Sequence, residues 1–192
     1  MPHEVSEDTL KKLLNEGKFL VRDINGKTIN GLISWFMNNR PQKSKFTILI
    51  NSSGGSPGLV AYTASVLKTM KSDFHLTGVA FGECGSAALA LLQCCNERVV
   101  IKHTGLFVHN IEDTFQLSSQ THDLNKVKTR LGISRNLENE LIELQRKRCG
   151  MTRAQWMKLA KRGQDFPGTA IFPKEAKKLG LIDQIVESYP IF

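Results

Sequence analysis

The sequence predicts an α/β domain built around a parallel sheet. Two observations carry this prediction. Short apolar segments rich in β-branched residues alternate along the chain with segments whose apolar residues recur at helical spacing. Residues 46–50 (FTILI) are apolar throughout, as expected of a strand that a parallel sheet buries on both faces. The 192 residues suit one compact domain, so residues 1–192 are expected to form a single unit.

Six segments have the strand pattern, because each is short and apolar and is bounded by glycine, proline or polar residues. Asn25-Gly26 is expected to form a turn after the first of them, and Gly82 to Ser86 a turn after the third. In chain order the expected strands cover residues 18–23, 46–50, 75–81, 98–102, 106–109 and 181–186.

The remaining periodic segments predict helices. Pro57 suits the first turn of one, with Ser56 as its N-cap, and Thr152 and Gln155 have capping-box spacing at the start of another. Residues 87–95 are apolar on every side and should lie centrally. Gly132 is expected to bend the longest helix. In chain order the helices cover residues 10–16, 28–38, 57 onward, 87–95, 123–148, 152–163 and 173–179.

Charge and cysteine content narrow the function classes. The net charge is +8, but the densest basic stretch, residues 146–148, lies among glutamates on a helix, which favours a solvated helix face over a nucleic-acid site. The four cysteines include no CxxC pair, so free thiols in a reducing, cytoplasmic compartment are expected rather than zinc or disulfides. A polar N-terminus and the lack of long apolar runs predict neither a signal peptide nor a membrane span.

Two loops could carry chemistry. Gly54 and Gly55 follow a buried strand, where glycines let backbone N–H groups approach a ligand, although an ordinary turn explains them equally well. Ser86 stands at the start of the apolar helix, where free N–H groups and the helix dipole favour negative charge. Read alone, Ser86 is more simply a helix N-cap.

His109 closes the strand 106–109 and is the candidate general base. A lone histidine at a strand end is usually structural, and it gains a catalytic interpretation only if the fold brings it to Ser86. The separation of 109 − 86 = 23 residues fits one helix and one strand returning to the same end of the sheet. The sequence gives no indication of a metal or cofactor for this chemistry.

Together these segments resemble the Clp-type serine peptidases, the family of ClpP proteolytic subunits. Each motif is weak alone, but they occur in the family's order and at nearly its spacing, over most of the chain. Residues 50–56 (INSSGGS) are similar to the family pattern I-N-S-P-G-G, and residues 82–92 (GECGSAALALL) to G-Q-A-A-S-M-G-A-x-L-L. Residues 106–109 (LFVH) are similar to the family strand that ends in the catalytic histidine. Residues 149–151 (CGM) are similar to T-G-Q, and residues 175–183 (EAKKLGLID) to E-A-x-x-x-G-L-I-D.

The resemblance implies a spiral α/β fold with a protruding helical handle at about 118–148, and a serine endopeptidase that cleaves extended polypeptides inside a homo-oligomeric chamber of stacked rings. It places the nucleophile on Ser86, its base on His109, and the oxyanion hole on the N–H groups of Gly55 and Ala87, with Gly54 beside them. An AAA+ unfoldase is the implied partner, although the arm before the first expected helix is shorter than in the family.

The third position of the triad departs from the family pattern. The aspartate that would complete the triad falls at Gly168, seven residues before Glu175, and the nearest carboxylate upstream is Asp165. Asp165 is therefore the candidate third member, with an ordinary loop residue as the alternative. This departure and the changed residues after His109 keep open a catalytically silent Clp-like subunit for assembly or binding. A crotonase-type acyl-CoA enzyme is a second alternative, because it shares the related spiral fold and a glycine-built oxyanion hole.

Overall fold

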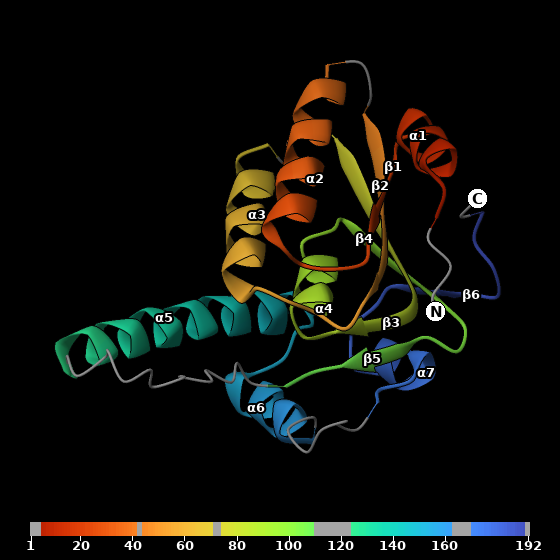
Figure 1. The fold of residues 1–192 in the computed structure, drawn as a ribbon. Helices are drawn as coiled ribbons and strands as arrows, with labels where there is room; N and C mark the ends of the chain where they lie inside the picture. The colour runs from red at the N-terminus through yellow and green to blue at the C-terminus, as the bar shows by residue number, and fades with distance from the viewer. Residues whose placement is uncertain (1–4, 42–43, 71–73, 110–123, 163–169, 191–192) are drawn as a thin grey trace.

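The computed structural model describes residues 5–41, 44–70, 74–109, 124–162 and 170–190. Within these ranges one parallel sheet forms the centre of the molecule, in the order β1-β2-β3-β4-β6, and β5 pairs with the end of β3 (Figure 1). The strands are β1 (Lys18–Val21), β2 (Lys45–Ser52), β3 (His75–Gly85), β4 (Glu97–Ile101), β5 (Gly105–Phe107) and β6 (Gln184–Val186). Each of the six strands overlaps one of the predicted segments.

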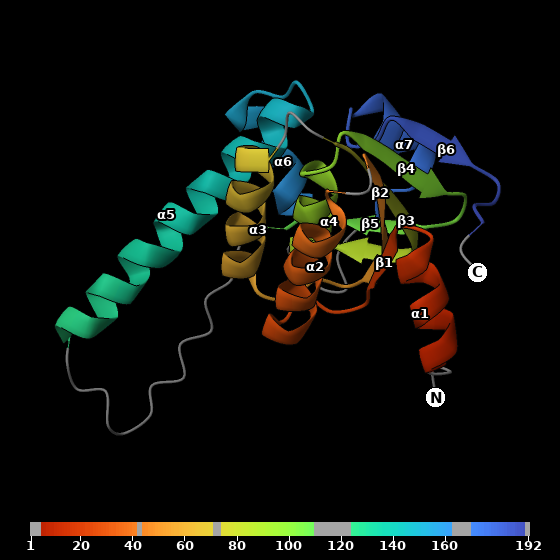
Figure 2. The ribbon, with the colours of Figure 1, turned by 90° about the horizontal axis from the view of Figure 1, so that it is seen from above.

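Helices cover both faces of the sheet. α2, α3 and α4 pack on one face and α1 lies on the other, while α5 extends away from the body (Figure 2). The helices are α1 (Glu7–Asn15), α2 (Gly26–Asn39), α3 (Pro57–Met70), α4 (Ser86–Gln93), α5 (Leu124–Arg148), α6 (Arg153–Arg162) and α7 (Pro173–Lys178). None of these helices is both long and apolar enough to cross a membrane.

The strands alternate their side chains between two cores, as the pleat requires. In β2, Ile48 and Ile50 join the large core under α2, α3 and α4, whereas Leu49 joins a smaller cluster with Leu13 of α1 on the opposite face. All three side chains of β2 are at most 1% exposed. The uniformly apolar segment 46–50 thus reflects burial on both faces, as predicted.

β3 is longer than expected and leads directly into the central helix. Its first part pairs with β2 and β4 up to Ala80, and its last part, Glu83 to Gly85, pairs with β5 while Cys84 still pairs with Ser52 of β2. The predicted turn over 82–86 is therefore wrong. Gly82 within this strand has a φ of +67°, which a side chain rarely adopts, and beyond it β3 gains β5 as a neighbour.

Local capping explains where two helices begin. The Asn25 side chain accepts a hydrogen bond from the N–H of Thr28, so Asn25 is the N-cap of α2 rather than part of a free turn. The predicted capping box is confirmed at α6, where the N–H of Thr152 donates to Gln155 Oε1 at 2.8 Å and the N–H of Gln155 donates to Thr152 Oγ1 at 3.2 Å.

α5 is one continuous helix that passes through Gly132 without the expected bend. Its C-terminal half is anchored in the core by Leu141 and Ile142, each 5% exposed, whereas Ile133 in the projecting half is 63% exposed. At its end, Arg148 donates hydrogen bonds to the carbonyls of Cys95 and Asn96. Residues 118–123 of the predicted handle lie outside the described ranges.

A buried ion pair fastens the C-terminal segment to the sheet. The guanidinium of Arg98 in β4 is 4% exposed and donates from Nε to Asp183 Oδ2 at 2.9 Å and from Nη2 to Asp183 Oδ1. Its Nη1 donates to Gln93 Oε1 at 2.7 Å and to the Gly180 carbonyl at 2.8 Å. The hydrogen bonds from Arg98 hold the pKa of Asp183 below its ordinary value.

Replacing Asp183 with asparagine should destabilise the fold, because Arg98 would stay buried without a counter-charge. We expect a loss of about 2 kcal/mol of unfolding free energy at pH 7, less than for a fully buried pair since the Asp183 side chain is 35% exposed. The native pair stabilises above the ordinary aspartate pKa near 4 and loses this contribution as the pH falls through the lowered pKa. Urea unfolding at pH 7 and at pH 3 measures both effects.

Glu187→Gln is the matched control, because Glu187 pairs with Lys102 at the surface and its side chain is 80% exposed. This control should change the unfolding free energy by less than about 0.5 kcal/mol. Equal losses of unfolding free energy in Asp183→Asn and Glu187→Gln would contradict the prediction that the buried pair stabilises the fold more than the surface pair.

Candidate active site

Three backbone segments meet beside the end of β3 without room for side chains between them. A Cβ added to Gly54 would lie 2.8 Å from the Cβ of Ser86, and one added to Gly55 would lie 2.4 Å from the carbonyl oxygen of Ile24. The N–H of Ile24 donates to the Gly54 carbonyl at 3.1 Å, and the N–H of Ser56 donates to the Ile24 carbonyl at 2.9 Å. The two glycines thus let a strand-like loop run against Ser86.

Ser86 stands at the junction of β3 and α4 in a strained conformation. Its φ of +51° is uncommon for a residue with a side chain and costs on the order of 1–3 kcal/mol. It is the first residue of α4, and the N-cap is Gly85, which has no side chain to cap with. The simpler interpretation of Ser86 as an N-cap is therefore wrong.

The N-terminus of α4 gives this site its electrostatic character. The backbone N–H groups of the first helical turn have no acceptor within the helix, and the helix dipole adds partial positive charge there. Ala87 lies in this turn and is 4% exposed, and the rest of the helix is buried beneath it. A negatively charged oxygen next to Ser86 would be stabilised at this position.

Strand register carries His109 toward Ser86. β5 runs parallel to the end of β3 and pairs Cys84 with Leu106 and Gly85 with Phe107. Two residues beyond the last pair, the chain reaches His109, which is half-buried. Ser86 and His109 line the same cavity, as a pairing of nucleophile and base would require.

This cavity has a volume of about 190 Å³, far above the roughly 10–15 Å³ that one water needs. Its walls come from the chain around Gly55 and Pro57, the start of α4, the end of β5, one face of α5 and the α6 side chain Trp156. Its lining residues are Gly55, Pro57, Ser86, Ala87, Ala90, Phe107, Val108, His109, Glu138, Leu141, Ile142, Gln145 and Trp156.

Ser86 is the only hydroxyl and His109 the only imidazole among these lining residues. The nearby thiol of Cys84 is fully buried, and desolvation, reinforced by the charge of Glu83, raises its pKa far above the ordinary cysteine value. It stays protonated at neutral pH and is a poor nucleophile. In the described part of the chain, no three histidine, cysteine or acidic side chains gather in a way that could hold a metal ion.

The sequence located some parts of this site and missed others. Gly54, Gly55, Ser86, Ala87 and His109 lie together here, while Asp165 and Gly168 fall outside the described residues. The wall formed by α5 and α6 was not foreseen. Its only signal in the sequence is the spacing of Glu138, Leu141, Ile142 and Gln145, which marks one face of a helix without saying what that face covers.

The family follows from a comparison of the whole chain. The sequence model described as Clp protease matches residues 2–189. This chain belongs to the Clp protease family. The expected family and fold class, a Clp-like α/β fold with a protruding helix, are confirmed. A comparison with curated proteins found no match. As a Clp protease the chain is a peptidase by family, and Clp proteases generally form oligomeric rings and bind polypeptides.

Gly55→Ala in this Clp protease should disrupt the loop beside Ser86. The new Cβ would meet the Ile24 carbonyl oxygen, and the φ of +141° at this position is strained for any side chain. We expect a loss of about 2 kcal/mol or more in unfolding free energy, measured by urea denaturation.

Gly58→Ala is the control, since a Cβ there would have no neighbour closer than 3.8 Å and α3 is helical at that point. It should be neutral or stabilise the protein by up to about 1 kcal/mol. A similar loss in both variants would show that the close backbone approach at Gly55 is not the cause.

Proposed function

We propose that this Clp protease is a serine endopeptidase in which Ser86 attacks the peptide bond and His109 is its general base. The observation that carries the proposal is that a strained serine at a helix N-terminus shares one cavity with a histidine. Strained backbone at a nucleophile is a common way to expose its side chain at a strand-to-helix turn. The family match favours this chemistry over the acyl-CoA alternative.

In the proposed mechanism, Ser86 Oγ forms a bond to the scissile carbonyl carbon as its proton passes to His109. The carbonyl oxygen becomes an oxyanion, which accepts hydrogen bonds from the N–H groups of Gly55 and Ala87. The intermediate then collapses, the C–N bond breaks, and the histidine gives its proton to the leaving amine. A water molecule then attacks the acyl carbon while its proton passes to His109. The bond between Ser86 Oγ and the acyl carbon breaks, and His109 returns the proton to Ser86 Oγ, which regenerates Ser86.

Two further parts of the proposal rest on the family resemblance. Asp165 is the candidate that orients His109 and stabilises its charged form. Extended substrate is expected to pair with backbone near Gly54 and Gly55, where the loop already pairs with Ile24 as a strand would. The silent-subunit alternative is motivated by Gly168, which stands where the family aspartate is expected.

Assembly into a chamber is proposed from the shape of the chain. α5 projects beyond the body in both views (Figures 1 and 2). Ile133, in the N-terminal half of this helix, is an exposed large apolar side chain. A projecting helix with an exposed large apolar side chain gains stability when another subunit covers that side chain. We therefore propose that α5 interdigitates with its counterparts between stacked rings of a homo-oligomer.

A fluorophosphonate probe should label Ser86 in the purified protein, because the probe reacts with serines activated by a base and an oxyanion hole. We expect one adduct by mass spectrometry, none in Ser86→Ala, and at least about 10³-fold slower labelling in His109→Ala. Asp165→Asn in the same assay should slow labelling if this carboxylate orients His109.

The control for this assay is Ser56→Ala, which removes a neighbouring loop hydroxyl that does not line the cavity and should leave labelling unchanged. Protein that is folded and oligomeric but takes up no probe would contradict the peptidase proposal and support the silent subunit.

Ile133→Asp should weaken the proposed assembly, since a carboxylate would replace an apolar side chain at the contact between rings. Light scattering coupled to size exclusion is expected to show a multimer for the native chain and smaller species for this variant, with unchanged far-UV circular dichroism. The conservative variant Ile133→Leu should keep the native mass. A native chain that is monomeric at working concentration would refute the chamber.

A further inference from the structure

The cavity beside Ser86 contains one acidic side chain, Glu138 of α5. It is half-buried, and the residues that line the cavity include no lysine, no arginine and no other carboxylate. Nothing in the proposed reaction uses this carboxylate. A carboxylate partly removed from water and facing a reaction cavity is costly unless a partner neutralises it.

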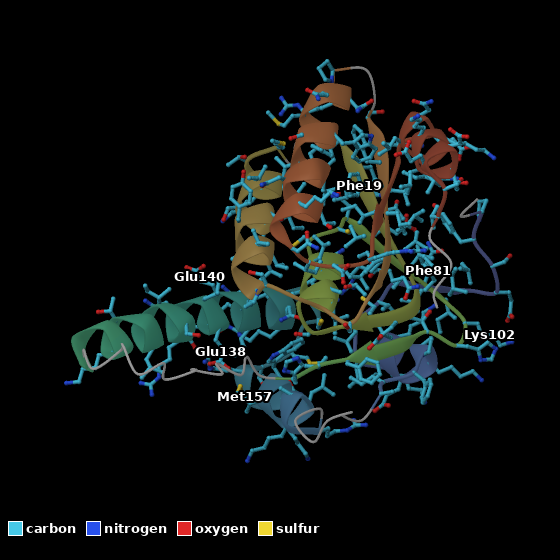
Figure 3. The ribbon with its side chains drawn as sticks, viewed as in Figure 1. Phe19, Phe81, Lys102, Glu138, Glu140 and Met157 are labelled. Carbon is cyan, nitrogen blue, oxygen red and sulfur yellow. The ribbon has the colours of Figure 1, made fainter. Side chains whose placement is uncertain are left out.

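The helical repeat directs Glu138 to the cavity and its neighbour away from it. Glu138, Leu141 and Gln145 are three and four residues apart, so they share one face of α5, and all three line the cavity. Figure 3 shows Glu138 on the side of α5 that faces α6 and Glu140 on the opposite side, toward α3. Glu140 lines a separate groove between α3, α4 and α5.

No counter-ion for Glu138 lies among the residues that the structure describes. Among the described residues, no side chain forms a hydrogen bond or ion pair with it. Two cations of this region are engaged elsewhere. Arg146 pairs with Glu143, and Arg153 contacts Asn139 and Glu143. The carboxylate is therefore available to a group that enters the cavity from outside.

The rest of the cavity suits a long side chain with a cationic end. The walls are apolar and aromatic, with Phe107 and the buried ring of Trp156, against which an aliphatic stem and a cation can both pack. Gln145 donates from Nε2 to the Leu141 carbonyl at 3.2 Å, which leaves its Oε1 as a second acceptor among the side chains that line the cavity.

We infer that this cavity binds a lysine or arginine side chain of the substrate, and that Glu138 selects it. The bound residue is the one whose carbonyl Ser86 attacks, because Ser86, Ala87 and Gly55 line the same cavity as Glu138. An apolar side chain would desolvate the carboxylate without pairing it, and an acidic one would be repelled. The inference rests on the proposed peptidase function and adds its substrate class.

Competition with probe labelling tests the inference without requiring turnover. Two peptide aldehydes, identical except for a terminal argininal or norleucinal, compete with the fluorophosphonate for Ser86. In the native protein, the argininal concentration that halves the labelling rate should be at least tenfold below that of the norleucinal. Glu138→Gln, which keeps the shape and removes the charge, should lower this ratio by at least fivefold.

Glu140→Gln is the matched control, since it removes the same charge from the opposite face of the same helix, and it should keep the native ratio. The inference is overturned if the norleucinal competes as well as the argininal, if neither aldehyde competes, or if the ratio persists in Glu138→Gln. The fluorophosphonate probe carries neither the arginine nor the norleucine side chain, so its labelling of Ser86 does not depend on Glu138. Absence of labelling in the native protein would instead refute the proposed function, and this inference with it.

Discussion

The site depends on a backbone contact that leaves no space for a Cβ atom. Gly54 and Gly55 lie against Ser86 and Ile24 so closely that any side chain would overlap them. The contact is held by hydrogen bonds between Ile24 and the loop, so it is part of the sheet's edge rather than a loose turn. It fixes where the loop's N–H groups lie relative to Ser86, and hydrogen-bond donors fixed before the reaction are the main source of oxyanion stabilisation.

The sheet supplies the remaining order around this contact. β3 pairs first with β2 and β4 and then, beyond Gly82, with β5, so a single strand sets both the position of Ser86 and the register that leads to His109. Behind it, the fully buried α4 cannot shift without disturbing the core. The buried pair of Arg98 and Asp183 holds the C-terminal segment to β4 and reaches Gln93 at the end of α4. Strain at Ser86 persists because these elements fix both of its flanks.

Sequence patterns located every strand of this sheet because burial on one or both faces leaves a clear apolar signal. They failed where geometry depends on a partner distant in sequence. The extension of β3 to Gly85 requires β5 as a neighbour, and the role of Ser86 as the first helical residue rather than its cap follows from that extension. Gly132 was expected to bend α5, yet a glycine costs a helix only about 1 kcal/mol, which neighbouring turns can absorb. The sequence could not show that Glu138 lines the cavity, because periodicity indicates which residues share a helix face but not what that face covers.

α5 connects two features that sequence alone treats separately. Its anchored half forms a wall of the cavity through Leu141, Ile142 and Gln145, while its other half projects from the body. Because α5 is one continuous helix, a force on the projecting half would be passed along it to the anchored half. The opposing restraint is Arg148, which fixes the helix end to the carbonyls of Cys95 and Asn96. In an assembly that grips the projecting half, the position of Glu138 relative to Ser86 would therefore depend on contacts between subunits, so that substrate selection and assembly would be coupled through one helix.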